Sequence, residues 1–94
     1  MPDGASKLAA KTYSVTYDLN GGTGATAPTD ADTYTVGQGV TAKAAPTGLV
    51  PPTGKTFDGW NTEADGSGEY VAAGTGIIAM PSGGGLTLYA KWSN

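Results

Sequence analysis

The stretch Thr56-Phe57-Asp58-Gly59-Trp60-Asn61 carries the strongest structural signal in this chain of 94 residues. It falls in an expected strand over 55–60, where Phe57 and Trp60 are three positions apart and would point to opposite faces of a straight strand. Gly59 stands between the two aromatic residues, and a glycine inside a strand indicates a bulge or a kink. We therefore expect a bulge that turns both rings inward.

Turn signals extend this strand into a hairpin. Asp65-Gly66 is a tight-turn pair, and it leads to a second short strand over 69–72. Asn20-Gly21-Gly22 marks another tight turn, and weaker strand patterns are found over 33–36 and 40–44. The middle of the chain is therefore expected to consist of short strands joined by glycine turns.

Strict alternation of side chains predicts two stronger strands near the ends of the chain. In the first, one face carries the apolar residues Tyr13, Val15, Tyr17 and Leu19, and the other carries Thr12, Ser14, Thr16 and Asp18. In the last, one face carries Leu86, Leu88, Ala90 and Trp92, and the other carries Thr87, Tyr89 and Lys91. This pattern is typical of a strand with one face buried and the other exposed to solvent.

The spacing of glycine and proline fixes the fold class and the domain division. Among the longer stretches free of both residues, only 5–20 could hold a helix of ordinary length, and its second half alternates as a strand. The fold is therefore expected to be mainly β, or α+β at most. We expect one domain over 12–94, preceded by a flexible tail over 1–11.

Composition permits a small glycine-rich domain and excludes several function classes. Thirteen residues are Leu, Ile, Val or Phe, a low share, but five tyrosines and two tryptophans add apolar area and the net charge is only −3. The chain has no His, Cys or Arg, which disfavours zinc, haem, conventional nucleophilic catalysis and nucleic-acid binding. No apolar run is long enough for membrane insertion, and Met1-Pro2-Asp3-Gly4 lacks the apolar core of a secretory signal. We expect no cofactor and no enzymatic activity.

Two glycine-rich stretches imitate nucleotide-binding motifs without meeting their requirements. The stretch ending Gly54-Lys55-Thr56 has Leu49 where a phosphate-binding loop needs glycine, and no helix signal follows it. Gly22-Thr23-Gly24 is followed by Pro28 and a polar stretch instead of the helix that would hold a pyrophosphate. Both are interpreted as loops.

Acidic residues in the expected hairpin loop resemble the start of a calcium loop. Glu63, Asp65 and Glu69 are weak metal candidates, because oxygen ligands at alternate positions suit calcium. The closing bidentate glutamate would fall at Ala72, so a solvated hairpin loop is the favoured interpretation. A carboxylate pair such as Asp18 and Asp58 is a distant hydrolase candidate.

The aromatic residues divide into core and candidate ligand contacts. A first group lies mostly on the expected inward faces: Tyr13, Tyr17, Phe57, Trp60, Tyr70 and Trp92. Tyr89 lies on the opposite face of the last strand, where an exposed ring can stack on a sugar or a partner. Tyr89 is therefore the candidate ligand contact.

Taken in order, the segments resemble a known family. The motifs that carry the resemblance are Tyr13-x-Val15-x-Tyr17-Asp18-x-Asn20-Gly21-Gly22, Thr56-Phe57-Asp58-Gly59-Trp60-Asn61-Thr62 and Leu86-Thr87-Leu88-Tyr89-Ala90-Lys91-Trp92. They resemble the Listeria–Bacteroides repeat, which is related to the B repeats of internalins, over roughly residues 12–92. The loop at Gly48-Leu49-Val50-Pro51-Pro52-Thr53 is longer than usual for the family, and Gly83-Gly84-Gly85 loosens the approach to the last strand.

The resemblance implies a β-grasp-like mixed sheet with a short or absent helix, whose first and last strands lie in parallel at its centre. It also implies a secreted or wall-attached bacterial protein, with neighbouring repeats and no catalytic residue or cofactor. Shared family positions, together with the hairpin tyrosine, are read as fold determinants: Tyr17, Gly22, Phe57, Gly59, Trp60, Tyr70, Tyr89 and Trp92.

These observations give two leading expectations for function. The first is a non-catalytic extracellular module, a spacer or an adhesive protein-interaction repeat that is monomeric in isolation. Its partner would be a host or bacterial surface protein or a glycan, bound for example at a sheet edge over 33–36 or 69–72. The alternative is a carbohydrate-binding module that uses Tyr89 or Trp60.

Overall fold

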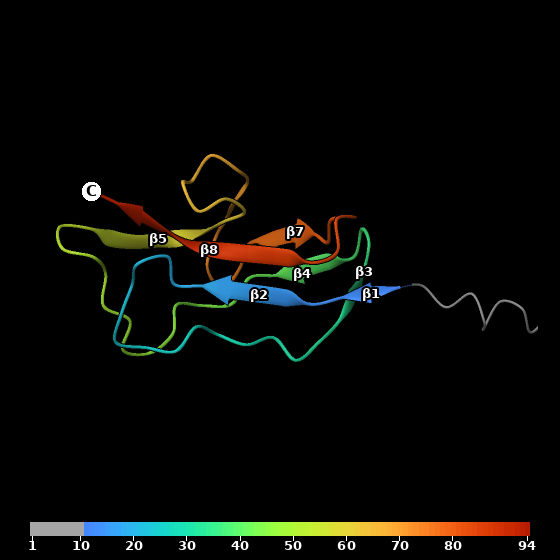
Figure 1. Cartoon of the computed structure of the whole chain (residues 1–94), viewed down its shortest axis with the longest axis horizontal. Coiled ribbons are helices and arrows are strands. Elements are labelled where there is room, and N and C mark those ends of the chain that lie inside the picture. Colours follow the sequence, from blue (N-terminus) through green and yellow to red (C-terminus); the bar gives the residue numbers. More distant parts are fainter. Residues whose placement is uncertain (1–10) are drawn as a thin grey trace, which may run out of the picture.

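A computed structural model describes residues 11–94, and this part of the chain folds into strands and loops without a helix (Figure 1). Residues 1–10, which make up nearly all of the expected tail, lie outside the described residues. The strands are β1 Thr12–Tyr13, β2 Val15–Asp18, β3 Tyr34–Thr35, β4 Gly39–Thr41, β5 Thr56–Asn61, β6 Tyr70–Val71, β7 Ile77–Ala79 and β8 Leu86–Ser93. The expectation of a mainly β fold is confirmed.

The central sheet has the order β2-β8-β5-β6 and is mixed. β2 and β8 pair in parallel, from Val15 opposite Leu86 to Asp18 opposite Tyr89, whereas β5 is antiparallel to both β8 and β6. The parallel pairing of the terminal strands agrees with the expectation. We expected both strands at the centre of the sheet, but only β8 lies there. β2 forms an edge of the sheet, and its Thr16 makes an isolated bridge to Thr29.

Two smaller strand pairs depart from the expected strands. The first alternating segment is divided at Ser14, so that β1 pairs with β3 while β2 joins the central sheet. At this point the Ser14 carbonyl accepts a hydrogen bond from the Leu86 amide at 3.2 Å, next to the first β2–β8 pair. β7 was not expected from the sequence, and it pairs with β4 in antiparallel register, with Val40 opposite Ile78.

The core lies between the central sheet and the β4–β7 pair. Trp60, Val40 and Leu88 are completely buried, and Met80 is nearly so. The remaining buried apolar residues are Val15, Tyr17, Ala42, Val71, Ile78, Leu86 and Ala90. A two-stranded layer therefore covers the central sheet without a helix, and the aromatic rings make up for the shortage of aliphatic side chains.

The expected bulge is present in β5. Phe57 pairs with Trp92 and Trp60 with Ala90, so β5 advances three residues while β8 advances two. Gly59 adopts a φ of +85°, a conformation that residues with a Cβ rarely adopt. As a result the rings of Phe57 and Trp60 meet edge to face, with their centroids 5.3 Å apart.

Candidate functional site

The predicted fold determinants at the centre of the molecule hold one backbone segment. The Tyr17 hydroxyl accepts a hydrogen bond from the Lys43 amide at 3.1 Å, and the Trp60 indole donates one to the Lys43 carbonyl at 2.8 Å. Burial raises the pKa of Tyr17, the hydrogen bond from Lys43 opposes this effect, and the charge of Asp30 adds to it. The polar atoms of these two aromatic side chains are therefore hydrogen-bonded inside the fold.

Trp92 and Gly22 are packed against each other at the far end of β8. The Trp92 indole donates a 2.7 Å hydrogen bond to the carbonyl of Asn20, which itself has a positive φ of 51°. A Cβ on Gly22 would lie 2.8 Å from the Trp92 ring and 2.9 Å from Leu49. Gly22 thus leaves the space that the tryptophan occupies.

Tyr70 does not lie inward as expected. Its side chain is half exposed, because Val71 faces the core and Tyr70, its neighbour on the strand, must take the other face. The Tyr70 ring instead covers the backbone at Gly59, where a Cβ would come within 2.8 Å of it. Tyr70 therefore packs on the bulge from the solvent side.

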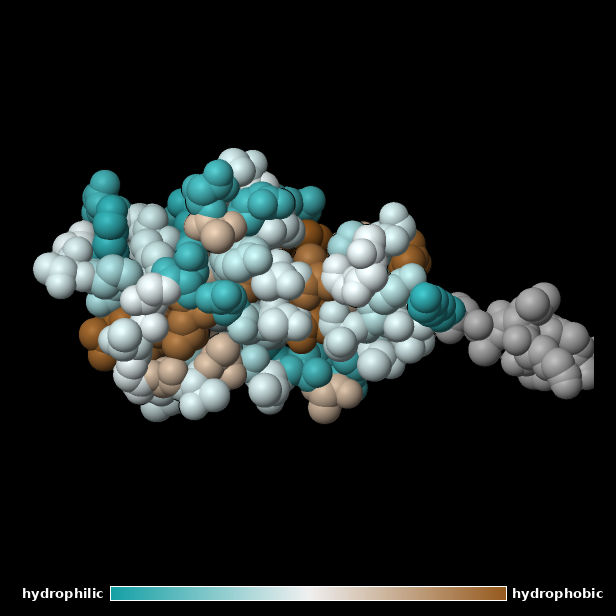
Figure 2. Space-filling model, in the orientation of Figure 1, coloured by the Kyte–Doolittle hydropathy of each residue, from teal (hydrophilic) through white to brown (hydrophobic). Residues whose placement is uncertain are grey.

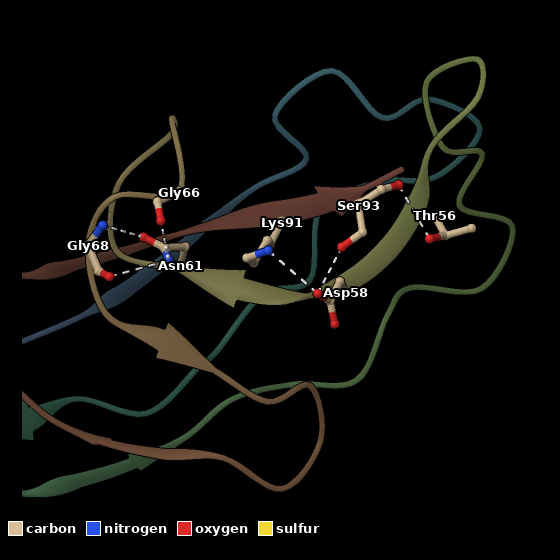
Figure 3. Close-up of polar contacts among 7 residues, drawn as sticks. All are labelled: Thr56, Asp58, Asn61, Gly66, Gly68, Lys91 and Ser93. Carbon is tan, nitrogen blue, oxygen red and sulfur yellow. Dashed lines mark hydrogen bonds and ion pairs between the residues drawn. The ribbon is translucent and has the colours of Figure 1, made fainter.

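The loop between β5 and β6 is organised by one buried polar side chain (Figure 3). Asn61 is 2% exposed, and its side-chain oxygen accepts hydrogen bonds from the amides of Glu63 and Gly68, both at 2.9 Å. Its side-chain nitrogen donates to the carbonyls of Gly66 and Gly68. The loop that resembles a calcium loop is therefore closed by an amide side chain.

The three weak metal candidates do not form a set of metal ligands in this loop. Within residues 11–94 no group of three acidic side chains is placed to hold a metal ion, and Glu63, Asp65 and Glu69 form no exception. Asp65 instead accepts hydrogen bonds from the hydroxyl and the amide of Ser67, which lower its pKa. The interpretation of this segment as a hairpin loop agrees with the geometry.

The proposed carboxylate pair is also divided between separate contacts. Asp58 accepts a hydrogen bond from the Ser93 hydroxyl at 2.8 Å and forms an exposed ion pair with Lys91 at 3.5 Å (Figure 3). Asp18 accepts a hydrogen bond from the Asn20 amide at 2.7 Å. The Asp58–Lys91 pair is half exposed, so it contributes at most about 1 kcal/mol to stability.

Tyr89 lines a cavity that is open to solvent. The volume of this cavity is about 470 Å³, within the range of ligand sites. Apolar atoms in its lining come from Ile78, Leu86, Ala79 and Pro81. Figure 2 shows a narrow strip of hydrophobic surface, in brown, that crosses the region of β7 and β8. The remaining lining residues are Thr62, Glu63, Glu69, Gly85, Thr87 and Tyr89. The cavity therefore combines a phenol ring, two hydroxyls and two carboxylates, and it contains no lysine.

The sequence patterns did not predict this cavity. Tyr89, on the opposite face of the last strand from Leu86 and Leu88, is partly exposed. Its neighbours in register are Asp18 on β2 and Asn61 on β5. Glu63 and Glu69 join it because the Asn61 network folds the loop back beside β8. The motif containing Trp60-Asn61-Thr62 was the available signal, since it fixes that loop.

A second polar contact lies between β2 and β3. The Tyr34 hydroxyl donates a 2.7 Å hydrogen bond to Asp30, which raises the pKa of Tyr34 to about 12, with smaller contributions from burial and from neighbouring charges. Burial acts to raise the pKa of Asp30, but the hydrogen bonds from Tyr34 and Asp32 and the charge of Lys43 lower it overall. This pair anchors the long loop before β3.

Comparison with known proteins identifies the family. The model of the Listeria-Bacteroides repeat domain matches residues 13–91, so the chain belongs to this family of bacterial repeat modules. No curated protein and no solved structure matched the chain. A helix suited to crossing a membrane is absent from residues 11–94.

Proposed function

We propose that this chain is a non-catalytic extracellular module of a bacterial surface protein, acting as a spacer or a protein-interaction repeat. Membership of the Listeria-Bacteroides repeat family over residues 13–91 carries the proposal. The motif residues support it, because Tyr17, Trp60 and Trp92 form fold contacts and are not arranged for a reaction.

The direction of the chain supports the spacer role. β2 and β8 run in parallel, so the first described residues and the C-terminus lie at opposite ends of the molecule (Figure 1). When a chain enters a domain at one end and leaves it at the other, the domain adds its own length to the distance that the chain spans. β8 alone, with its eight residues, spans about 26 Å at roughly 3.3 Å per residue.

Labelling of cells tests the extracellular location. An antibody against this domain, applied to intact cells of the source bacterium, is expected to stain the surface, and external protease should remove the signal. Staining that requires permeabilised cells would contradict the proposal. A panel of hydrolase substrates tests the non-catalytic role, and turnover that is abolished by Asp58→Asn would refute it.

A domain exchange in the parent protein separates the two roles. An unrelated domain of similar length replaces the repeat, and surface display and adhesion of the cells are measured. Retained adhesion is the result expected of a spacer. Loss of adhesion with normal display is expected of an interaction repeat. In that case the cavity beside Tyr89 would be the first candidate for the binding site.

Carbohydrate binding is the second candidate function, because Tyr89 shares the cavity with hydroxyls and carboxylates that can bind sugar hydroxyls. A glycan array tests this function, with Tyr89→Ala as the cavity variant. Trp60→Ala is uninformative here, because Trp60 is completely buried. Array binding that is indifferent to Tyr89→Ala would exclude this cavity as the sugar site.

A further inference from the structure

We propose that the cavity beside Tyr89 binds a protonated primary amine on an aliphatic stem, presented as a lysine side chain by a partner protein. The inference rests on the proposed function and names the partner chemistry of an interaction repeat. It follows from the combination of lining residues and from their charge.

The apolar part of the cavity lining suits a chain of methylene groups. Ala79 and Pro81 expose apolar side chains there, and the small exposed parts of Ile78 and Leu86 complete this part of the lining. Long cationic side chains bury their aliphatic stem on such surface while the charged head stays near polar groups. A lysine side chain has this division between an apolar stem and a charged end.

The rim of the cavity carries negative charge without a partner. Glu63 and Glu69 line it, and neither forms an ion pair with another residue in the described part of the chain, where Lys91 pairs with Asp58 instead. Tyr89 adds a ring whose face attracts cations. An ammonium group would therefore meet two carboxylates and a phenol ring in a cavity whose lining is partly apolar.

The same observations favour a cation over a neutral sugar. Tyr89 is only partly exposed on β8, which limits a stacked sugar and a cation alike, so the carboxylates distinguish the two ligands. Two unpaired carboxylates offer a neutral ligand only hydrogen bonds, whereas they also attract an ammonium group through charge. Charge complementarity therefore selects the lysine side chain.

The test is a titration of the full 94-residue chain, labelled with ¹⁵N, with Nα-acetyl-lysine N-methylamide. The matched probe is Nα-acetyl-norleucine N-methylamide, which keeps the stem and lacks the ammonium group, and N-acetylglucosamine is the sugar probe. We expect the lysine probe alone to shift the amide signals of Thr62, Glu69, Thr87 and Tyr89. Added salt should weaken its binding.

Variants connect the binding to the cavity. Glu63→Gln combined with Glu69→Gln should weaken binding of the lysine probe about 10-fold, and Tyr89→Ala about 3-fold. The control combines Asp32→Asn with Asp58→Asn, which changes the net charge equally outside the cavity and should leave binding unchanged. Well-dispersed amide spectra show that each variant is folded.

Four results would overturn the inference. They are equal shifts from the lysine and norleucine probes, shifts from the sugar probe alone, no shift from any probe, and binding that survives the double glutamine variant. If the lysine probe fails while antibody labels intact cells, the cavity assignment falls and the proposed surface function stands.

Discussion

Tyr17 and Trp60 meet edge to face, with ring centroids 4.9 Å apart, and together they satisfy both backbone groups of Lys43. The two residues come from β2 and β5, which are separated by β8 in the central sheet. Lys43 follows β4, so the contact joins the central sheet to the two-stranded layer that covers it. One aromatic pair therefore links the two layers of the core.

Replacing Trp60 by a smaller residue should lower the stability of the domain. Trp60→Phe leaves the Lys43 carbonyl without its donor and opens a cavity at a completely buried position, so we expect a loss of about 2–4 kcal/mol in the free energy of unfolding. Tyr17→Phe removes only the acceptor of the Lys43 amide and should cost about 1–2 kcal/mol. Urea unfolding followed by circular dichroism measures both values. Tyr89→Phe is the control, and equal costs for Trp60→Phe and Tyr89→Phe would contradict the prediction.

The bulge in β5 should depend on the absence of a side chain at Gly59. Gly59→Ala combines a positive φ with a Cβ placed 2.8 Å from the Tyr70 ring, and we expect a loss of about 2–3 kcal/mol in the free energy of unfolding. Gly37→Ala has a similar φ but meets nothing within 4 Å, so it should cost only about 1 kcal/mol. Urea unfolding compares the two.

A second substitution separates the two effects at Gly59. Tyr70→Ala removes the ring that the new Cβ would strike, so the cost of Gly59→Ala should be smaller in a Tyr70→Ala background. The Val71 carbonyl, 3.0 Å from the same Cβ, keeps part of the clash. If Gly59→Ala costs the same in both backgrounds, the tyrosine is not the obstacle.

Local sequence patterns were sufficient to predict the last strand, β8, and the bulge in β5. The alternation from Leu86 to Trp92 predicts β8 because a half-buried strand imposes a period of two on its residues. The three-residue spacing of Phe57 and Trp60 around Gly59 similarly requires a bulge if both rings are to face the core. In each case the information lies within a few neighbouring residues.

Features set by distant contacts were missed. β7 contains only Ile77, Ile78 and Ala79, and it is a strand because it pairs with β4, far away in the sequence. Tyr70 lies on the exposed face of β6 because the register places Val71 opposite Trp60. The cavity likewise depends on how the loop after Asn61 folds beside β8, and residue patterns do not encode that placement.

The loop between β5 and β6 should open when its buried amide is removed. Asn61→Ala eliminates hydrogen bonds from the amides of Glu63 and Gly68, and we expect a loss of about 2–3 kcal/mol in the free energy of unfolding. Amide hydrogen exchange should accelerate most at these two positions. Asp65→Ala, which removes only the exposed contact with Ser67, serves as the control. A uniform increase in exchange over the whole chain would argue against a local role.

Tyr34 should make stability fall at alkaline pH. Its pKa is raised from 10.0 to about 12 chiefly by the hydrogen bond to Asp30, so the folded state favours the neutral phenol. This contribution is fully present below pH 10 and is lost as the pH rises from about 10 to 12. Ultraviolet titration of the phenolate should show a late step that moves to lower pH in Asp30→Asn. Asp32→Asn, which leaves the hydrogen bond intact, should move it much less.

The parallel pairing of β2 with β8 should make the domain resist stretching along the direction of the chain. The two strands carry the load in opposite directions when the ends are pulled, so the hydrogen bonds between Val15–Asp18 and Leu86–Tyr89 are strained together. Single-molecule pulling from the two ends should therefore require a several-fold higher force than pulling through cysteines introduced at Thr12 and Thr87. These two positions lie at the same end of the strand pair, where the bonds break one after another. Equal forces in the two geometries would show that another contact limits unfolding and would weaken the spacer role proposed for the domain.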